Sequence, residues 1–419
     1  MQEQSMNRIQ ATLEAFNSIG VTSEGMQRLA YTFEEKQVQD LFAEFCSKEG
    51  MSVRVDEVGN VIARREGSIK DAPAIAIGSH LDTVYNGGKY DGTAGIVAGL
   101  EVIRRLNDSR IETEYPIEVI CFVSEESSRF GISTIGSKAM AGELSRQSIA
   151  KVTDKKGVYL TDAMKNSGYQ IEKLAKAKRY KDELRAFIEL HIEQGPELEQ
   201  QNKQIAIATG IAAPTRLNVL VKGMASHSGT TSMEHRKDAL VAAAKQIVTI
   251  EEAAKKEMKY KTVATVGIFD VFPGAMNVVP DSVLYKVDIR GLDMQSKKRI
   301  ISKLDKKIKQ LEQDKGIVTT TEILSDETPI LLDKDIQQVL ELACEDLSIE
   351  PLSMPSGAGH DAMNMQLICP TGLIFIPSQK GISHNPAEYT PLSDIVRGVD
   401  VLEKSVLRLA SVKEGKVQK

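Results

Sequence analysis

Apolar residues along the chain recur in blocks that predict helices alternating with buried strands. Three- and four-residue apolar spacing is typical of amphipathic helices, and short continuous apolar runs are typical of buried strands. In the first half of the chain, this spacing predicts helices at 3–16, 33–48 and 96–106. Strands are predicted at 53–63, broken by a turn at Gly59-Asn60, and at 74–77, 117–123 and 186–190. We expect the polar stretch 138–185 to be helical. Strand, helix and strand in succession favour an α/β fold with a mostly parallel sheet flanked by helices.

The pattern changes near residue 212, where half-buried strands begin to alternate with long helices. The predicted strands cover 215–223, 262–269, 283–290 and 318–324, and the predicted helices cover about 236–256 and 296–313. Strands with one polar face suit a small antiparallel α+β domain. The chain then returns to the first domain with a helix at 336–346, a strand at 373–376 and a helix at 392–409. We therefore expect an α/β domain built from 1–212 and 329–419, with a smaller α+β domain at 213–328 inserted in it.

Length and composition agree with two domains and argue against several classes of protein. The chain has 419 residues, with 42% apolar and 26% charged residues. Its net charge of −5, without a basic block, argues against nucleic acid as a partner. The N-terminus, MQEQSMNRIQ, is too polar for a secretory signal, and no apolar run is long enough to span a membrane. Four scattered cysteines without a C-x-x-C pair are typical of a reduced, cytoplasmic protein. We expect the charged tail after Val412 to be frayed.

A glycine-rich loop after the predicted strand 74–77 holds the first candidate chemistry. The stretch GSHLDTVYNGGKYDGTAG places His80 and Asp82 at the strand end and Asp91 among four glycines. Glycine lets the backbone turn tightly and bring Asp91 back beside His80. A lone His-x-Asp pair is more often a surface or capping feature, so this loop alone predicts little. It gains weight from similar residues at the ends of the other predicted strands.

The other candidates follow the strands at 117–123 and 186–190. Together with the glycine-rich loop they form one set: His80, Asp91, Glu125, Glu126, His191 and His384. Histidine nitrogens and carboxylate oxygens suit divalent metals of the zinc type. Asp91 could bridge two ions, Asp82 could orient His80, and the remaining glutamate could move a proton. Such a pair of ions can activate water for hydrolysis of a C–N bond. The alternative, that the histidines are core residues, is weak because all three fall at strand–loop junctions.

With this set of residues, the chain resembles the metal-dependent amidases of the hydantoinase/carbamoylase type. These amidases belong to the dinuclear-zinc aminoacylase and exopeptidase superfamily. The resemblance covers nearly the whole chain, and its motifs occur in the family's order: GSHLDTVYNGGKYDG, EESSRFG, ELHIEQGPELE, SHSGTT, NVVP, SGAGHDA and GISHNPAE. This group includes N-carbamoyl-L-amino acid hydrolases, β-ureidopropionases and allantoate amidohydrolases. The resemblance implies two divalent metal ions per subunit, Zn2+ or Mn2+, Co2+ or Ni2+.

The resemblance also implies a role for each metal-site residue. His80, Asp91 and His191 would hold one ion. Asp91, Glu126 and His384 would hold the other. Glu125 would act as general base and then as general acid. Asp82 would orient the imidazole of His80.

In the smaller domain the resemblance implies a homodimer interface and part of the substrate pocket. His227 would polarise the scissile carbonyl, usually in the site of the partner subunit. Arg290 would pair with a substrate carboxylate. The pocket would be completed by Gln194, Arg216, Asn277 and the loop that begins at Gly357 and Ala358. From the residues alone, Arg290 is more typical of a solvated strand residue, whereas His227 is equally compatible with a plain loop position. We expect His360 to order its loop or a ligand rather than bind metal.

These expectations together predict a cytoplasmic, homodimeric amidohydrolase that acts on a linear ureido or amide compound with a carboxylate. The simplest substrate is an N-carbamoyl-L-amino acid, which would yield the amino acid, CO2 and ammonia. Allantoate, or an N-acyl amino acid or dipeptide, is an alternative substrate. A different class, an inactive metal- or ligand-binding protein, is disfavoured because a pure binder needs no Glu125. Ser232 and the segment 212–216 depart from the family pattern, which leaves the substrate open.

Overall fold

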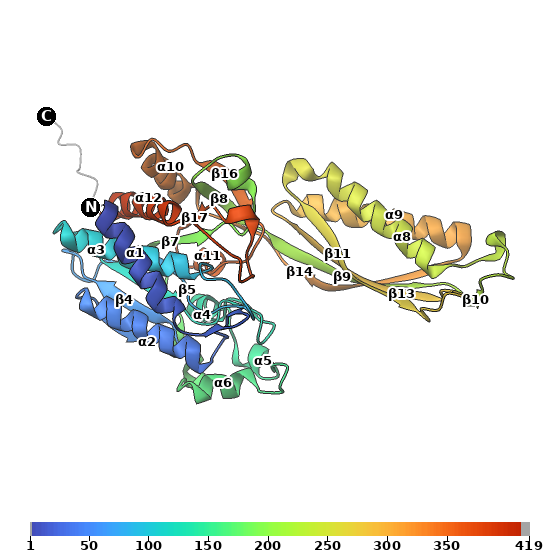
Figure 1. The fold of residues 1–419 in the computed structure, drawn as a ribbon, viewed down its shortest axis with the longest axis horizontal. Coiled ribbons are helices and arrows are strands. Elements are labelled where there is room, and N and C mark those ends of the chain that lie inside the picture. The colour runs from blue at the N-terminus through green and yellow to red at the C-terminus, as the bar shows by residue number, and fades with distance from the viewer. Residues whose placement is uncertain (1, 412–419) are drawn as a thin grey trace. The chain divides into compact units, whose positions relative to one another are not determined.

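Four parallel strands form the centre of the larger unit of this computed structural model, which describes residues 2–411 (Figure 1). In spatial order they are β17 (Thr371–Ile376), β7 (Leu184–Ile192), β5 (Ala74–His80) and β6 (Ile117–Phe122). The antiparallel strands β8 (Ala206–Ile211), β4 (Val61–Arg65) and β3 (Ser52–Val55) extend the sheet at its two ends. Every residue of β5 and β6 is buried, so both faces of the sheet are covered. The predicted α/β fold class is confirmed.

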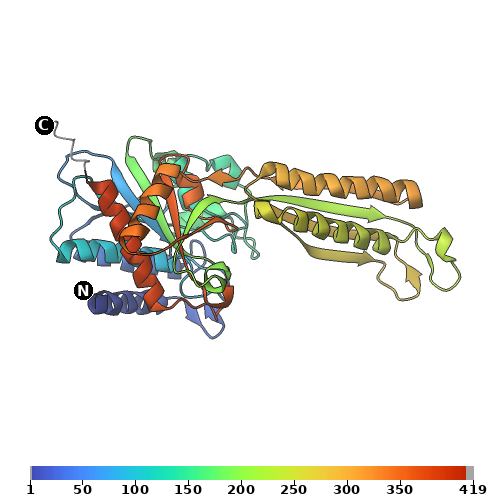
Figure 2. The ribbon, with the colours of Figure 1, turned by 90° about the horizontal axis from the view of Figure 1, so that it is seen from above.

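Long helices pack against this sheet through one shared apolar core (Figures 1 and 2). They are α1 (Gln2–Asn17), α2 (Phe33–Lys48), α3 (Thr93–Asp108), α10 (Lys334–Asp346) and α12 (Leu392–Ala410). Helix α3 lies close to β7 because Gly95 has no side chain. A Cβ at Gly95 would stand 2.2 Å from the Leu190 carbonyl oxygen. This close approach fixes the start of α3, and with it the loop that carries Asp91.

The segment 135–177 differs from the single helical stretch expected for it. It folds into the short helices α4 (Ile135–Ala141), α5 (Arg146–Ile149), α6 (Leu160–Asn166) and η1 (Ile171–Ala177). The prediction of a helix over 138–185 is therefore wrong for most of its length. Gly142, Gly157 and Gly168 have positive φ angles of 80°, 81° and 92°, which interrupt a helix. Buried residues of these pieces form a separate apolar cluster around Ile135 and Leu160.

The smaller unit, 210–331 with 355–357, is an antiparallel sheet with helices on one face. Its strands run in the order β11 (Val263–Phe272), β13 (Ser282–Gly291), β9 (Ala213–Lys222) and β14 (Val318–Asp326). Alternate residues of β9 and β13 are buried against α8 (Ala239–Lys256) and α9 (Met294–Lys315). The intervening residues leave one sheet face open, as the alternating pattern predicts.

Shorter elements complete the two units. They are β1 (Val21–Thr22), β2 (Gly25–Met26), α7 (Glu197–Gln200), β10 (Ser226–His227), η2 (Met233–His235), η3 (Met258–Tyr260), β12 (Val278–Val279), β15 (Ile330–Leu331), β16 (Leu352–Ser356), α11 (Ala362–Met365) and η4 (Gln379–Gly381). All four cysteines are buried and unpaired. Within residues 2–411 no helix is both long and apolar enough to cross a bilayer. The charged tail after Val412, expected to be frayed, lies outside the described residues.

Candidate metal centre

The candidate ligands meet at the carboxyl ends of the four parallel strands. His80 is the last residue of β5, and His191 is the last but one of β7. Glu126 follows β6, and His384 lies beyond the end of β17. Parallel strands present their carboxyl ends along one edge of a sheet, which is where open α/β sheets place their sites. The topology therefore gathers residues that are far apart in the sequence.

Asp91 stands in the middle of this group with its two oxygens facing different partners. Its Oδ1 lies 3.4 Å from His80 Nε2 and 3.1 Å from His191 Nε2. Its Oδ2 lies 3.2 Å from His384 Nε2, and that nitrogen is also 3.1 Å from Glu126 Oε1. Four of these side chains are almost completely buried, whereas His384 is half exposed. One carboxylate thus joins two groups of donors, as a bridging ligand must.

Gly92 lets the Asp91 loop pass directly beside the His80 ring. Its φ angle is +63°, and a Cβ there would stand 2.5 Å from three atoms of the imidazole. We expect Gly92→Ala to displace His80 and to weaken metal binding, in addition to the roughly 1–2 kcal/mol that a left-handed residue costs. Gly50→Ala is the matched control, because Gly50 has φ +79° with nothing within 4 Å of a Cβ. Denaturant unfolding and metal content would be compared. Equal metal content in the two variants would contradict the expectation.

Two buried carboxylates hold the turn that carries Glu125 and Glu126. Asp82 Oδ1 accepts from the Glu125 N–H at 3.0 Å, and Asp82 Oδ2 accepts from the Glu126 N–H at 2.9 Å. Glu35 Oε1 accepts from the N–H of Ser124, the preceding residue, at 2.8 Å. Ser124 has a left-handed φ of 52°, so the chain turns sharply after β6. Asp82 also lies near His80, with 3.3 Å between its Oδ1 and the imidazole Nδ1.

A third buried carboxylate, Glu388, links the other two ligand loops. Its Oε1 accepts from the N–H groups of Tyr90 and Asp91 at 2.8 and 3.0 Å. Its Oε2 accepts from the Ser383 hydroxyl at 3.0 Å, next to His384. Sequence reasoning missed Glu35 and Glu388. The only available signal for Glu388 was its place at the end of the motif GISHNPAE.

The donor set fits two divalent metal ions of the zinc type. His80, Asp91 and His191 offer atoms within 4.8 Å of one another, and so do Asp91, Glu126 and His384. Imidazole nitrogens with carboxylate oxygens are the ligands such ions prefer. A third group of Glu189, His191 and His360 satisfies the same distance limit. It shares His191, whose Nδ1 lies 2.8 Å from the Ile192 carbonyl oxygen and whose Nε2 faces Asp91. This geometry groups His191 with Asp91.

Burial and mutual charge shift the pKa values of these groups strongly. Burial raises the pKa of Glu125 well above its usual range, although His80 opposes the shift. Burial alone would lower the pKa of His80, but the surrounding carboxylates outweigh it and raise that pKa well above the ordinary value. Burial would raise the pKa of Asp91, but His191 and the other two imidazoles hold it well below normal. Such opposed shifts are typical of functional sites.

We expect metal affinity to increase with pH, because the imidazoles must lose protons to bind a metal. Hydrogen bonds to Asp91 and Glu126 raise the pKa of His384 to about 11 in the metal-free protein. This value is above the unfolded value of about 6.5. The ion pairs of His384 therefore stabilise the metal-free fold fully below the unfolded value and lose that effect as pH rises through the folded one. Calorimetric titration with Mn2+ in buffers of different ionisation enthalpy would detect proton release. Metal affinity independent of pH between about 6 and 8 would contradict the prediction.

Gln194 is the one predicted substrate-binding side chain that the structure places at the metal centre. Its Nε2 donates to Asp91 Oδ2 at 2.7 Å. The same nitrogen lies 3.3 Å from the Ser383 hydroxyl. Its Oε1 is buried without a hydrogen-bond partner among the described residues. This amide is thus placed to contact a ligand beside Asp91. Ala358 also belongs to the larger unit.

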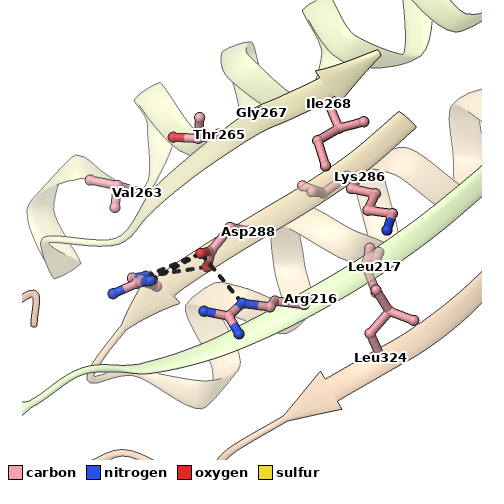
Figure 3. A pocket seen from close by; sticks show the side chains of 11 residues that line it. Arg216, Leu217, Val263, Thr265, Gly267, Ile268, Lys286, Asp288 and Leu324 are labelled. Carbon is pink, nitrogen blue, oxygen red and sulfur yellow. Dashed lines mark hydrogen bonds and ion pairs between the residues drawn. The ribbon is translucent and has the colours of Figure 1, made fainter. Parts of the chain in front are cut away.

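The predicted Arg216 of β9 lies on the open face of the smaller unit's sheet (Figure 3), and the predicted Arg290 belongs to the adjacent strand β13. Asp288 Oδ2 lies 3.1 Å from Arg290 Nη2 and 3.6 Å from Arg216 Nε. Arg290 Nη1 also donates to the Gly357 carbonyl oxygen at 3.1 Å. The cavity around them has a volume of about 450 Å³, and it is lined further by Lys286 and by apolar side chains. Three cations against one carboxylate favour an anionic ligand there.

His227 and Asn277 are neighbours at another part of the smaller unit. His227 pairs with Val278 between β10 and β12, and the Ser228 N–H donates to the Asn277 carbonyl oxygen at 3.0 Å. His227 Nδ1 accepts from the Gly229 N–H at 3.0 Å. His227 is exposed. These residues belong to the smaller unit, whereas the metal-centre residues belong to the larger unit.

Comparison with known proteins identifies several relatives that span almost the whole chain. The model of Peptidase family M20/M25/M40 matches residues 76–408. An uncharacterized hydrolase of Haemophilus influenzae is 42% identical over 408 residues, covering 97% of this chain and 99% of the relative. An N-carbamoyl-L-amino acid amidohydrolase of Geobacillus stearothermophilus is 39% identical over 388 residues, covering 93% and 94%.

The solved structures include one with closely similar architecture. An amidase of the hydantoinase/carbamoylase family from Burkholderia multivorans superposes with a TM-score of 0.90. It is 33% identical in sequence, and the match covers 97% of this chain and 98% of that chain.

Proposed function

The chain belongs to Peptidase family M20/M25/M40, and we propose that within it this protein is a two-metal amidohydrolase of N-carbamoyl-L-amino acids. The resemblance to hydantoinase/carbamoylase amidases inferred from the motifs is confirmed by the matching relatives. Hydrolysis would yield the amino acid, CO2 and ammonia. The relative from Geobacillus stearothermophilus supports this substrate class because its match covers nearly the full length of both chains.

The position of Asp91 is the observation that carries the two-metal proposal. Its two oxygens face separate donor groups, one with His80 and His191 and the other with Glu126 and His384. We assign each group to one divalent ion. When bound, such a pair supplies Lewis-acid activation of water and of a carbonyl oxygen. Zn2+, Mn2+, Co2+ and Ni2+ all accept this donor set.

Glu125 is the proposed general base and acid. It is 8% exposed, and its Oε2 lies 3.8 Å from His80 Nε2. Glu126 is turned instead toward His384. The two neighbouring carboxylates therefore have separate partners, which supports one ligand and one proton carrier. Glu125 would take a proton from the attacking water and deliver it to the leaving nitrogen. Asp82 would keep this turn and His80 in place.

The residues of the smaller unit are proposed to bind the substrate. Arg290 would bind its carboxylate through the guanidinium, which in the substrate-free protein donates to Asp288 and Gly357. Arg216 would assist from the neighbouring strand. In the larger unit, Gln194 and Ala358 would contact the substrate. His227 would polarise the scissile carbonyl, helped by Asn277. We keep the expectation of a cytoplasmic homodimer, in which His227 would serve the partner subunit's site.

Ammonia release from defined substrates tests the proposal. Protein depleted of metal with a chelator would be reloaded with Mn2+ or Zn2+ and incubated with N-carbamoyl-L-amino acids, allantoate, N-acetyl-L-amino acids and dipeptides. We expect ammonia from the N-carbamoyl compounds only when metal is present. Release from allantoate alone would change the substrate and keep the chemistry. Hydrolysis of only acyl or peptide substrates would overturn the ureido assignment. Two bound ions without turnover of any compound would favour a binding protein.

A further inference from the structure

Arg28 is a fully buried cation that the proposed mechanism does not use. It lies between β2 and α2 and is 0% exposed. Its guanidinium donates to carbonyl, amide and hydroxyl oxygens. Burial lowers the pKa of Arg28 to about 10, while the charge of Asp82 opposes the shift. Arginine is almost never fully buried unless it is paired, so its position requires an explanation.

The guanidinium of Arg28 is satisfied by oxygen atoms from three segments. Its Nε donates to the Leu81 carbonyl oxygen at 2.7 Å, and its Nη2 donates to the Thr93 hydroxyl at 3.0 Å. Its Nη1 donates to the carbonyl oxygens of Phe16 and Ile19 at 3.2 and 3.1 Å. The Arg28 guanidinium therefore links the end of α1 to both sides of the glycine-rich loop.

The two loop contacts flank the residues assigned to the first metal ion. Leu81 directly follows His80, and Thr93 stands two residues after Asp91 as the first residue of α3. The Thr93 N–H also donates to the Asp91 carbonyl oxygen at 2.6 Å. The Arg28 guanidinium thus contacts the chain next to both His80 and Asp91. The distance between these two side chains depends on how rigidly the guanidinium holds the two segments.

We propose that Arg28 is a positioning residue for the metal ion that His80, Asp91 and His191 would hold. The planar guanidinium directs five N–H groups at fixed angles, so it can hold two chain segments at a set separation. A lysine at this position keeps the charge but has no fork. The inference rests on the metal site of the proposed function and not on the identity of the substrate.

Arg28→Lys tests this role, with Arg179→Lys as its matched control. Arg179 is also buried in the larger unit, but it pairs with Glu118 near the start of β6, away from the metal centre. Chelator-treated proteins would be titrated with Mn2+ in competition with a chromophoric chelator. We expect Arg28→Lys to weaken Mn2+ binding by about 10–100-fold, the range typical of residues that orient metal ligands. Arg179→Lys is expected to lower the unfolding temperature of the metal-free protein without this loss.

Thr93→Val is the second variant, and it tests the positioning role of Arg28 if Arg28→Lys does not fold. It removes only the hydroxyl that accepts from Arg28 at nearly unchanged side-chain volume, and it too is expected to weaken Mn2+ binding. If both variants bind Mn2+ with affinities within about twofold of the Arg179→Lys control, the inference is overturned. Arg28 would then serve only to stabilise the fold. Failure of the unaltered protein to bind Mn2+ would instead contradict the metal site itself. The two outcomes are distinguishable because Mn2+ binding is measured on the unaltered protein as well as on the variants.

Discussion

Glu125→Gln is expected to lower kcat by about 10²–10⁴-fold while both metal ions remain bound. Glutamine has nearly the same shape as glutamate, but its amide cannot accept and deliver the proton. In the proposed assignment Glu125 is not a ligand, because Asp91, Glu126 and His384 would form the second donor group. Its buried position also raises its pKa well above normal, as suits a group that must release a proton late in the reaction. Turnover and metal content measured on the same preparation would check both halves of the prediction.

Glu126→Gln provides the contrast for this experiment. Glu126 has the same neighbouring turn, the same chemistry and similar burial, at 7% against 8% exposure for Glu125. Its carboxylate faces His384 at 3.1 Å, so its loss should reduce metal content as well as turnover. Unchanged turnover in Glu125→Gln would remove that residue from the mechanism. Loss of metal in both variants would show that Glu125 acts as a ligand.

The clustering of the candidate ligands could be predicted from the sequence because strand ends have a local signature. His80, Glu126 and His191 each follow or end an apolar run, and parallel strands bring such positions to one edge. The glycines around Asp91 indicated a tight turn for a physical reason that the structure confirms at Gly92. These signals depend only on neighbours in the chain, which is why pattern reasoning detects them.

The supporting groups could not be predicted because their partners are distant in the chain. Glu388 accepts from the Asp91 N–H across 297 residues, and Arg28 donates to Thr93 across 65. An isolated glutamate or arginine has no periodicity that marks it as buried. The expectation of a helix over 138–185 is wrong because local pattern does not show how the segment's apolar residues pack. Its short apolar groups pack in a separate cluster, and glycines with positive φ lie between the short helices.

Asp91→Asn is expected to abolish turnover by removing the only side chain shared by the two donor groups. The amide keeps one oxygen, so it can serve one group, but it presents an N–H donor to the other. Asp91 Oδ1 faces His80 and His191, while Oδ2 faces His384. The substitution should therefore lower the binding affinity for both ions. We expect fewer than two ions per chain and activity at the level of the blank. Metal content after gel filtration and ammonia release in excess Mn2+ would measure both.

Asp56→Asn is the control for losing a buried carboxylate elsewhere in the larger unit. Asp56 is 6% exposed and accepts from the N–H groups of Val58, Gly59 and Asn60 in the turn between β3 and β4. Its replacement should destabilise the fold, because amide N–H groups lose a charged acceptor, while two ions stay bound. Asp91→Asn with two tightly held ions would show that no single carboxylate bridges them. The four remaining ligands would then have to hold the metals as independent sites, and the two-metal mechanism would lose the shared oxygen ligand on which its geometry depends.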